Sequence, residues 1–463
     1  MRLEFLISWV LFISILLTAT CVHAQDLPSR TEILADLRLV QDHWIAANPD
    51  PGNRGWARAA YFTGHMAAYA VSPRSSDLNY AFAWADSNNW TLFGGPTTRN
   101  ADHQCCGQTY IALDAISPDL SHLADITTSI FGMVDSTPSD DWWWCDALFM
   151  AMPVFTGLGN IYGDDRYYDK LYDLYTDTKT TRGLYDSDHH LWYRDEDFMP
   201  PFTTPNGAPC FWSRGNGWVF AGHARVLADL PLDDPHRAEY VTTFQEMAAA
   251  LTASQRADGF WNVSLADTTD FPGPETSGTG FFAYGLAWGV RNGLLDEAVY
   301  LPAAVRAWEG ITTVAVHSDG FLGYVQGVGS EPASNQPVTW DDTTDFGVGA
   351  YLLAGSEMFL LADGASEVPV AEQFYLTQNV PNPFNPATQV RFYLPSSGPA
   401  HITIYDLAGR CVITLIDADL SSGHHAVTWR GLDTCGRSVP SGTYIYRLDG
   451  PGFGAARRMT LIR

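Results

Sequence analysis

Basic residues are scarce in this sequence. Of its 463 residues only 26 are Lys or Arg, against 52 Asp or Glu, and the formal net charge is −26. A chain of this charge repels a phosphate backbone, which argues against nucleic-acid binding. Anionic glycans remain open, because an Arg in a cleft can oppose the overall field. Only 17% of the residues are charged and 46% are apolar, which excludes a disordered chain and allows a large buried core.

Long apolar runs are also rare. One such run, residues 5–19, follows Arg2 and precedes Val22-His23-Ala24, a small-residue pattern suited to signal peptidase. The run is shorter than the ~20 residues needed to span hydrocarbon, and no second run follows it. We therefore expect residues 1–24 to be a signal peptide, the protein to be exported to the periplasm, the cell surface or the medium, and no transmembrane anchor.

Cysteine patterns typical of metal sites are missing. The six cysteines after residue 24 form no CxxC pair and no Cys/His metal spacing, so a structural zinc site is not expected. Adjacent Cys105 and Cys106 lie in apolar sequence and read as buried thiols. Pairing of Cys411 with Cys435 stays open. Nucleophile-elbow, P-loop and dinucleotide motifs are also lacking in a strand-turn-helix context.

The composition changes near residue 370. Residues 374–463 hold eight Arg, no Lys and five Asp, a net +3, whereas the first 373 residues hold 18 basic and 47 acidic residues, a net −29. The Pro-rich NVPNPFNPAT (379–388) then precedes short runs rich in β-branched and aromatic residues, separated by Ser/Gly turns. We expect a linker at 366–373 and a small Ig-like β-sandwich over 374–463.

Residues 25–365 read as mainly α-helical. Apolar runs rich in small residues recur six times, with 60 to 70 residues between the later ones, enough for an inner helix and a returning outer helix. This pattern predicts an (α/α)6 barrel whose Gly-rich helix entries gather at one mouth; an α-solenoid is the alternative. The six runs lie near Gly64, Gly107, Ala147, Gly215, Gly280 and Gly347.

Two carboxylates are candidates for acid–base chemistry. Asp146 follows three consecutive Trp residues in DWWWCDALFMAMP and precedes an apolar helix, so poor solvation should raise its pKa and let it act as a general acid. Asp102, in ADHQCCGQTY, starts the preceding inner helix, and its negative charge would help to keep Asp146 protonated. For both residues, helix capping is the alternative interpretation.

FWSRGNGWVF (211–220) is the most unusual stretch. Arg214 sits between Ser213 and a Gly-Asn-Gly turn, and its planar fork suits a carboxylate, while Trp218 could stack on a sugar ring. A structural ion pair is the alternative role for Arg214. HHLWYRD (189–195), with its two histidines, is expected to form a short hairpin or surface loop, and no metal partners at defined spacing accompany it.

Taken in order, DWWWCDALFMAMP, YGDDRYYD, LWYRD, WSRGNGWVFAGHARVL, SGTGFFAYGLAWGVRNGLL and DFGVGAYLLAGSE resemble the unsaturated rhamnogalacturonyl hydrolases of glycoside hydrolase families 88 and 105. The resemblance implies an (α/α)6 barrel with Asp146 as catalytic residue and Asp102 as second acid. It further implies substrate contacts by Trp144, Arg214 and Trp218. Where some members carry His after the Trp-Tyr pair, this chain has Arg194, which follows Trp192-Tyr193. We expect both Trp192 and Arg194 to contact substrate as well. The C-terminal stretch resembles Ig-like modules of flagellar hook-assembly type, which serve secreted enzymes in sorting or attachment.

The resemblance implies release of a 4,5-unsaturated uronic acid from the non-reducing end of lyase-generated oligosaccharides. Asp146 would protonate carbon 4 and help water to add at carbon 5, with no metal or organic cofactor, because the vinyl ether of the substrate supplies the reactivity. Two alternatives stay open. One is a conventional inverting glycosidase using Asp102 and Asp146, and the other is a glycan-binding protein without catalysis.

Overall fold

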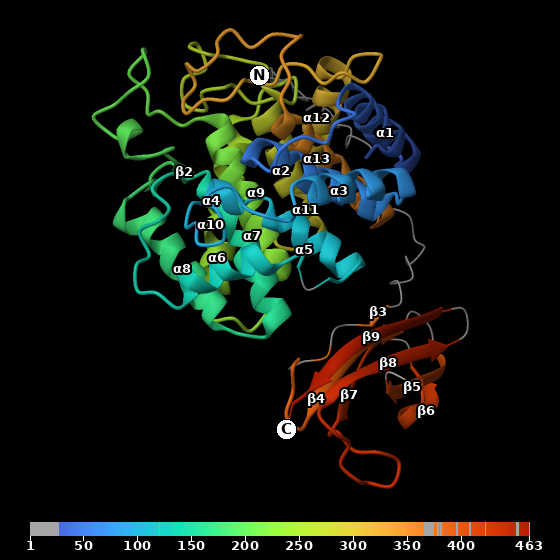
Figure 1. The fold of residues 1–463 in the computed structure, drawn as a ribbon. Helices are drawn as coiled ribbons and strands as arrows, with labels where there is room; N and C mark the ends of the chain where they lie inside the picture. The colour runs from blue at the N-terminus through green and yellow to red at the C-terminus, as the bar shows by residue number, and fades with distance from the viewer. Residues whose placement is uncertain are drawn as a thin grey trace, which may run out of the picture.

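The computed structural model describes residues 27–119, 121–364, 375–376, 379, 382–394, 397–406, 409–421, 423–450 and 453–462. The predicted signal peptide (1–24) and linker (366–373) lie outside the described residues. The described chain folds as a helical body followed by a smaller β body, which are coloured blue to orange and orange to red in Figure 1.

The helical body is an (α/α)6 barrel, as predicted. Each of the six glycine- and alanine-rich runs forms an inner helix, and each inner helix follows an outer helix that runs in the opposite direction. The inner helices are α2 (Trp56–Val71), α5 (Gly107–Ile116), α7 (Ala147–Tyr162), α9 (Ser213–Asp229), α11 (Thr276–Arg291) and α13 (Asp345–Gly364). The outer helices are α1 (Arg30–Ala47), α3 (Ser75–Ser87), α6 (Ala124–Val134), α8 (Arg166–Thr176), α10 (Arg237–Ser254) and α12 (Glu297–Gly310).

Shorter elements complete the helical body. They are α4 (Ala101–Gln104), the π-helical turns η1 (Asp177–Thr181) and η3 (Ile311–Ala315), the 3-10 turn η2 (Glu196–Phe198), and the hairpin strands β1 (Tyr185–Asp186) and β2 (Leu191–Trp192). The hairpin pairs Tyr185 with Trp192 in antiparallel register, so of the two possibilities left open for residues 189–195, a short hairpin or a surface loop, the structure has the hairpin.

Small residues close the ring of inner helices. A Cβ atom at Gly64 of α2 would overlap the backbone of Gly349 in α13, and one at Gly280 of α11 would lie 3.1 Å from Ala350. Only residues without bulky side chains let neighbouring helix backbones approach this closely. The first and last inner helices, α2 and α13, therefore pack side by side and close the barrel. The small residues at these contacts belong to the recurring runs from which the barrel was predicted.

The long connections lie at one end of the barrel. Residues 182–212, 255–275 and 316–344 precede α9, α11 and α13, whereas short turns follow the inner helices at the opposite end. In Figure 1 these long loops gather at the top of the view. The N-termini of all six inner helices therefore point toward the loop-rich end, and their dipoles favour negative charge there.

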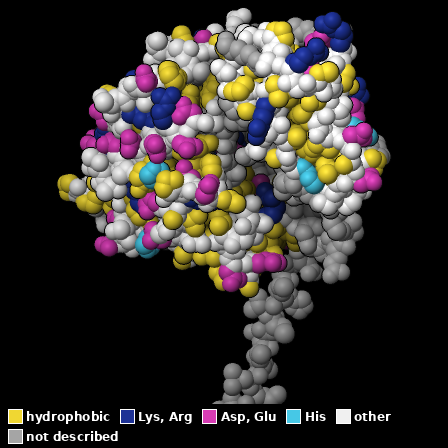
Figure 2. All heavy atoms as spheres, turned by 90° about the horizontal axis from the view of Figure 1, so that it is seen from below, with side chains coloured by type: hydrophobic (Ala, Val, Ile, Leu, Met, Phe, Trp, Pro, Cys, Tyr) yellow, Lys and Arg dark blue, Asp and Glu magenta, His cyan; other side chains and the backbone are white. Residues whose placement is uncertain are grey.

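Figure 2 views the molecule from below, where acidic side chains are spread over the surface.

The apolar helix α13 is a core element of the barrel. Within the described residues it is the one helix long and apolar enough to cross a membrane by length and composition. Of its 18-residue stretch Asp345–Ala362, 78% is buried against the other helices. Burial of this kind is the usual environment of an apolar helix at the centre of a helical barrel.

The β body is a sandwich of two antiparallel sheets, ordered β3-β4-β7 and β6-β5-β8-β9. Val390, Ile402, Trp429 and Tyr446 are among the residues of its shared apolar core. Cys411 and Cys435 are exposed free cysteines. The strands are β3 (Tyr375–Leu376), β4 (Thr388–Leu394), β5 (Gly398–Asp406), β6 (Cys411–Leu420), β7 (Gly423–Trp429), β8 (Gly442–Gly450) and β9 (Phe453–Leu461).

Candidate active site

Asp146 precedes the first residue of α7 at the loop-rich end of the barrel. It occupies the N-cap position, yet its side chain accepts no capping hydrogen bond from the helix. The carboxylate instead lies 3.5 Å from the Cys145 thiol, which donates to Oδ1, and 3.6 Å from Nε of Arg194. Asp146 is only 8% exposed. Capping, the alternative role considered from the sequence, therefore does not explain this residue.

Asp102 lies in the first turn of α4, beside α7. The cap of α4 is Asn100, whose side chain accepts hydrogen bonds from the backbone N–H groups of Asp102 and His103. The Asp102 carboxylate is thus free of a capping role as well. It is partly exposed and within electrostatic range of both Asp146 and Arg194.

The stretch after β2 brings a cation to the two carboxylates. The backbone N–H of Cys145 donates to the carbonyl of Arg194 at 2.8 Å, and Trp144 pairs with Asp195 in an antiparallel bridge. The Arg194 guanidinium forms an ion pair with Asp195, whose other oxygen accepts from the backbone N–H of Asp197. Asp195 therefore holds Arg194 in place, and Nε of Arg194, buried and without a hydrogen-bond partner, faces Asp146.

Burial and mutual charge favour a retained proton on the carboxylate pair. The pKa of Asp102 is raised to about 7, first by burial and then by the negative charge of Asp146, while Arg194 opposes the rise. The pKa of Asp146 is raised by burial, and the charges of Arg194 and Arg214 oppose that rise. The sequence predicted a raised pKa for Asp146 with Asp102 as a cause. The structure agrees on the direction, but the like-charge effect falls on Asp102.

Arg214 is buried and holds a loop. Its two terminal nitrogens donate to the backbone carbonyls of Gln326 and Gly327, at 2.6 and 2.8 Å. Its guanidinium lies 4.4 Å from the ring centre of Trp212 and 4.6 Å from that of Phe346. Arg214 is 1% exposed, and burial lowers its pKa to about 10. This geometry fixes the loop 316–344 over the start of α9.

The other residues of RGNGW join neighbouring segments. Gly215 lies beside Cys145 and Asp146, since a Cβ there would be in ordinary contact with the thiol at 3.5 Å and with Oδ1 of Asp146 at 3.8 Å, and its tightest contact would be the Trp212 ring at 3.2 Å. Asn216 accepts from the backbone N–H of Trp192 at 2.8 Å and donates to its carbonyl at 3.0 Å. The motif therefore holds the β2 strand, and the stretch after it, next to Asp146. This architectural role was not anticipated from the sequence.

Comparison with known proteins assigns the barrel to a family. The model of glycosyl hydrolase family 88 matches residues 37–362. The chain belongs to this family. The match confirms the resemblance predicted from the motifs, and it makes the protein a glycoside hydrolase.

Named relatives of this family 88 chain include an unsaturated 3S-rhamnoglycuronyl hydrolase from Formosa agariphila, 41% identical over 331 residues, which are 66% of this chain and 85% of the relative. A protein of the same name from Alteromonas sp. (strain LOR) is 37% identical over 219 residues, 47% of this chain and 51% of that one. A family 88 structure from Bacteroides vulgatus is 36% identical, with a TM-score of 0.69, and covers 72% of this chain and all of its own. A structure described as a polysaccharide lyase has the same TM-score and 37% identity, covering 73% of this chain and 99% of its own.

Two aromatic residues expected to touch substrate in this family 88 chain are instead in the core. Trp218 is 1% exposed and packs between Phe149 and Phe281, with ring centres 4.8 and 4.4 Å away. Trp192 is fully buried against Tyr175 and Tyr185. Neither ring has an open face for a sugar, so this structure supports packing roles for both. Arg214 is likewise held away from solvent.

Trp143 has the exposed ring that the sequence reasoning missed. It is 49% exposed, whereas Trp144, the residue named from the resemblance, is 3% exposed and Trp142 is fully buried. The Arg194 guanidinium lies 5.3 Å from the Trp143 ring centre, and Trp143 tilts against Trp144 at 4.7 Å. Side chains alternate in extended backbone, so Trp142 and Trp144 share one side and Trp143 the other. This alternation could have indicated from the sequence that Trp143 lies on the opposite side from Trp142 and Trp144.

The site is built from protein acids and one cation. Across the described ranges, no group of three or more His, Cys, Asp or Glu side chains is arranged to hold a metal ion. The groups that can move a proton here are Asp146 and Asp102. Beside them lie the exposed Trp143 and the partly buried Arg194, whose side chain is 19% exposed. This set can donate and accept a proton and can bind an anionic, ring-shaped substrate.

Proposed function

We propose that this family 88 chain hydrolyses the bond that holds a 4,5-unsaturated uronic acid at the non-reducing end of an oligosaccharide. The observation that carries the proposal is the pair of carboxylates with raised pKa, Asp102 and Asp146, beside a cation that Asp195 holds in place. The names of the two relatives support a rhamnoglycuronyl oligosaccharide as the substrate.

The pair fits hydration of the ring double bond. Asp146 donates its proton to carbon 4, and the positive charge that develops is shared between carbon 5 and the ring oxygen. Water then adds at carbon 5 and returns its proton to a carboxylate, so the acid is restored. The hemiketal formed at carbon 5 opens to a ketone, and the hemiacetal left at carbon 1 releases the next sugar.

The surroundings of the pair suit an anionic substrate. The unsaturated uronate carries a carboxylate, and Arg194 together with the N-termini of the inner helices provides positive potential in a chain of net charge −26. The exposed Trp143 ring beside Arg194 offers a flat apolar face for a sugar ring.

The deciding experiment follows the ultraviolet absorbance of the conjugated double bond. Lyase-generated oligosaccharides of several polysaccharides are supplied, and the expected result is loss of absorbance. A saturated uronide with the same linkage should be inert, and turnover in heavy water should place deuterium at carbon 4. Hydrolysis of the saturated compound without that label would instead identify a conventional inverting glycosidase.

A lyase is the second candidate, because one similar structure is described as a polysaccharide lyase. A lyase forms the double bond, so an intact polysaccharide would gain absorbance with time. The same assay therefore separates the two reactions by the sign of the change. A protein that binds these glycans but changes neither signal would be the non-catalytic alternative.

Export and attachment belong to the same proposal. The apolar run at 5–19, the small-residue pattern at 22–24 and the oppositely charged C-terminal stretch support a secreted or surface-held enzyme, whose β-sandwich meets the secretion machinery or the cell surface. Cell fractionation and N-terminal sequencing of the mature protein test it. Recovery of uncleaved protein from the cytosol would contradict it.

A further inference from the structure

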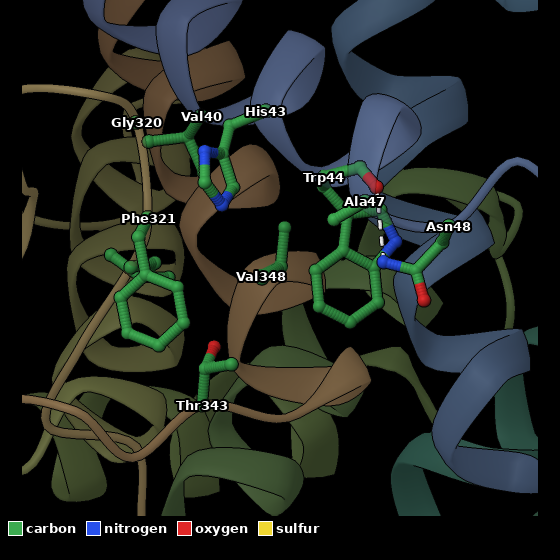
Figure 3. A pocket seen from close by; sticks show the side chains of 10 residues that line it. Val40, His43, Trp44, Ala47, Asn48, Gly320, Phe321, Thr343 and Val348 are labelled. Atoms are coloured by element: carbon green, nitrogen blue, oxygen red, sulfur yellow. Dashed lines mark hydrogen bonds between the residues drawn. The ribbon is translucent and has the colours of Figure 1, made fainter.

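A hollow of roughly 320 Å³ lies between the end of α1, the loop 316–344 and the start of α13. It contains neither Asp102 nor Asp146. Figure 3 shows the Phe321 ring on one side and the Trp44 ring on the other, with Val348 between them, Thr343 below and His43 above. Its size falls within the roughly 300–1,000 Å³ of small-molecule sites.

The hollow has polar atoms that the protein does not satisfy. Oγ1 of Thr343 is buried and has no hydrogen-bond partner, and Figure 3 shows it turned toward the hollow. Trp44, which is 8% exposed, presents its ring to the hollow, and its Nε1 lies on the side of Asn48. Nδ1 of His43 donates to the carbonyl of Asp319 at 2.9 Å, which leaves Nε2 as an acceptor in the neutral ring. Because buried polar atoms are normally paired, the Thr343 hydroxyl indicates that something polar belongs in the hollow.

The loop is fixed against α1 at this point. Gly320 has a φ of +92°, and a Cβ there would overlap the backbone of Leu39. On its other side the same loop is held by Arg214 through the carbonyls of Gln326 and Gly327. The walls of the hollow are therefore held from both sides, which gives a ligand a prepared shape rather than a collapsible gap.

The charges around the hollow exclude an anion. Arg58, whose guanidinium lies 5.4 Å from the Trp44 ring centre, is paired with Asp345 at 2.7 Å. Asp319, next to the lining residue Gly320, has a side chain that is 67% exposed and lies 3.8 Å from Nδ1 of His43. No unpaired cation among the described lining residues is available for a carboxylate or sulfate. A neutral ligand suits this field.

We propose that this hollow binds the neutral pyranose ring of a glycan, separately from the proposed catalytic site. The two aromatic rings suit the C–H faces of a sugar, and His43 and Thr343 offer an acceptor and a hydroxyl for its hydroxyl groups. The start of α13 separates the two regions. Val348 lines the hollow, whereas Phe346 stacks on Trp56 and lies over Arg214. A sugar held here would keep a glycan chain at the loop-rich end of the barrel.

The binding test does not depend on turnover. Protein-observed NMR titrations of the full chain carrying Asp146→Asn compare methyl α-L-rhamnopyranoside, which is neutral, with methyl β-D-glucuronide, which is anionic. The neutral glycoside should bind, with shifts at His43 and Trp44, and the glucuronide should not shift these signals. Phe321→Ala should weaken binding about tenfold, and Thr343→Val, which keeps the shape of the side chain, should weaken it by a smaller factor.

Phe131→Ala is the matched control, because Phe131 is an exposed aromatic residue of α6 that does not line the hollow. It should leave binding unchanged. The proposal is overturned if the neutral glycoside does not shift the His43 and Trp44 signals, if Phe321→Ala binds as tightly as its parent, or if the glucuronide competes at these residues. Binding that survives Phe321→Ala but is lost in Trp143→Ala would assign the sugar to the catalytic site instead. If the proposed catalytic function is wrong, this binding result does not change, so the two proposals can fail independently.

Discussion

The segments before α7 and at the start of α9 look alike in sequence but have different roles in the structure. DWWWCD and WSRGNGW each combine tryptophans with a charged residue at the entrance of an inner helix. The first leaves Trp143 exposed and its carboxylate unpaired by the helix, whereas the second buries Arg214, Asn216 and Trp218 in contacts with neighbouring segments. An unusual motif can therefore indicate either residues that take part in the chemistry or residues that hold neighbouring segments in place.

The largest effect should come from Asp146→Asn. The amide has nearly the same shape but cannot cycle a proton, so kcat should fall about 10²- to 10⁴-fold, while thermal unfolding changes little. Initial rates by absorbance loss, with a melting curve as control, check this. Activity near the wild-type level would remove the first segment from the mechanism.

Arg214→Lys should act mainly on stability. An ammonium cannot reach both carbonyls as the guanidinium does, and charged hydrogen bonds contribute ~1.5–3 kcal/mol each, so we expect a loss of about 2–4 kcal/mol in the free energy of unfolding. Denaturant titration measures it. An unchanged stability with a higher KM would restore the anion-binding role predicted from the sequence and erase the contrast between the segments.

Trp143→Ala should raise KM roughly tenfold and leave the melting temperature in place, because the ring is half exposed and its removal creates no cavity. Trp144→Ala is the informative partner, since its ring is buried and truncation should cost ~3–5 kcal/mol of stability. The opposite assignment of the two effects would show that Trp144 contacts substrate.

Arg194→Gln should shift the pH profile. Arg194 lowers the pKa of both Asp102 and Asp146, so its removal lets both values rise, and the protons are retained to higher pH. The alkaline limb of kcat/KM, which reports loss of the proton that Asp146 donates, should therefore move upward, whereas Arg194→Lys should keep it nearer the wild-type position. A limb that moves downward would mean that neither carboxylate controls it.

Truncation after residue 365 should have the smallest effect on catalysis. The sandwich has its own apolar core, and the proposed site lies in the barrel, so kcat/KM should stay within about twofold while the cellular location changes. A barrel that no longer folds after truncation would show that the two bodies depend on each other.

The helices were predictable because their signals are local. Periodic apolar runs and small residues at helix entries are visible within 15 to 20 residues, and all six predicted inner helices are present. The positions of Asp146 and Asp102 were predictable for a similar reason, since each stands at a helix entrance that the barrel directs to one end. Which residue feels the like-charge effect could not be found this way, because it depends on Arg194 and on the burial of both carboxylates.

The sequence by itself determined an acidic helical chain with six small-residue inner helices, a β-rich C-terminal body and two carboxylates at helix entrances. Only the tertiary structure decided that Trp143 is exposed and Trp218 buried, that Arg194 reaches Asp146, and that Arg214 holds the loop 316–344. The physical reason is that helix formation depends mostly on neighbours along the chain. Exposure, ion pairing and pKa depend on residues tens to more than a hundred positions away, which only folding brings together.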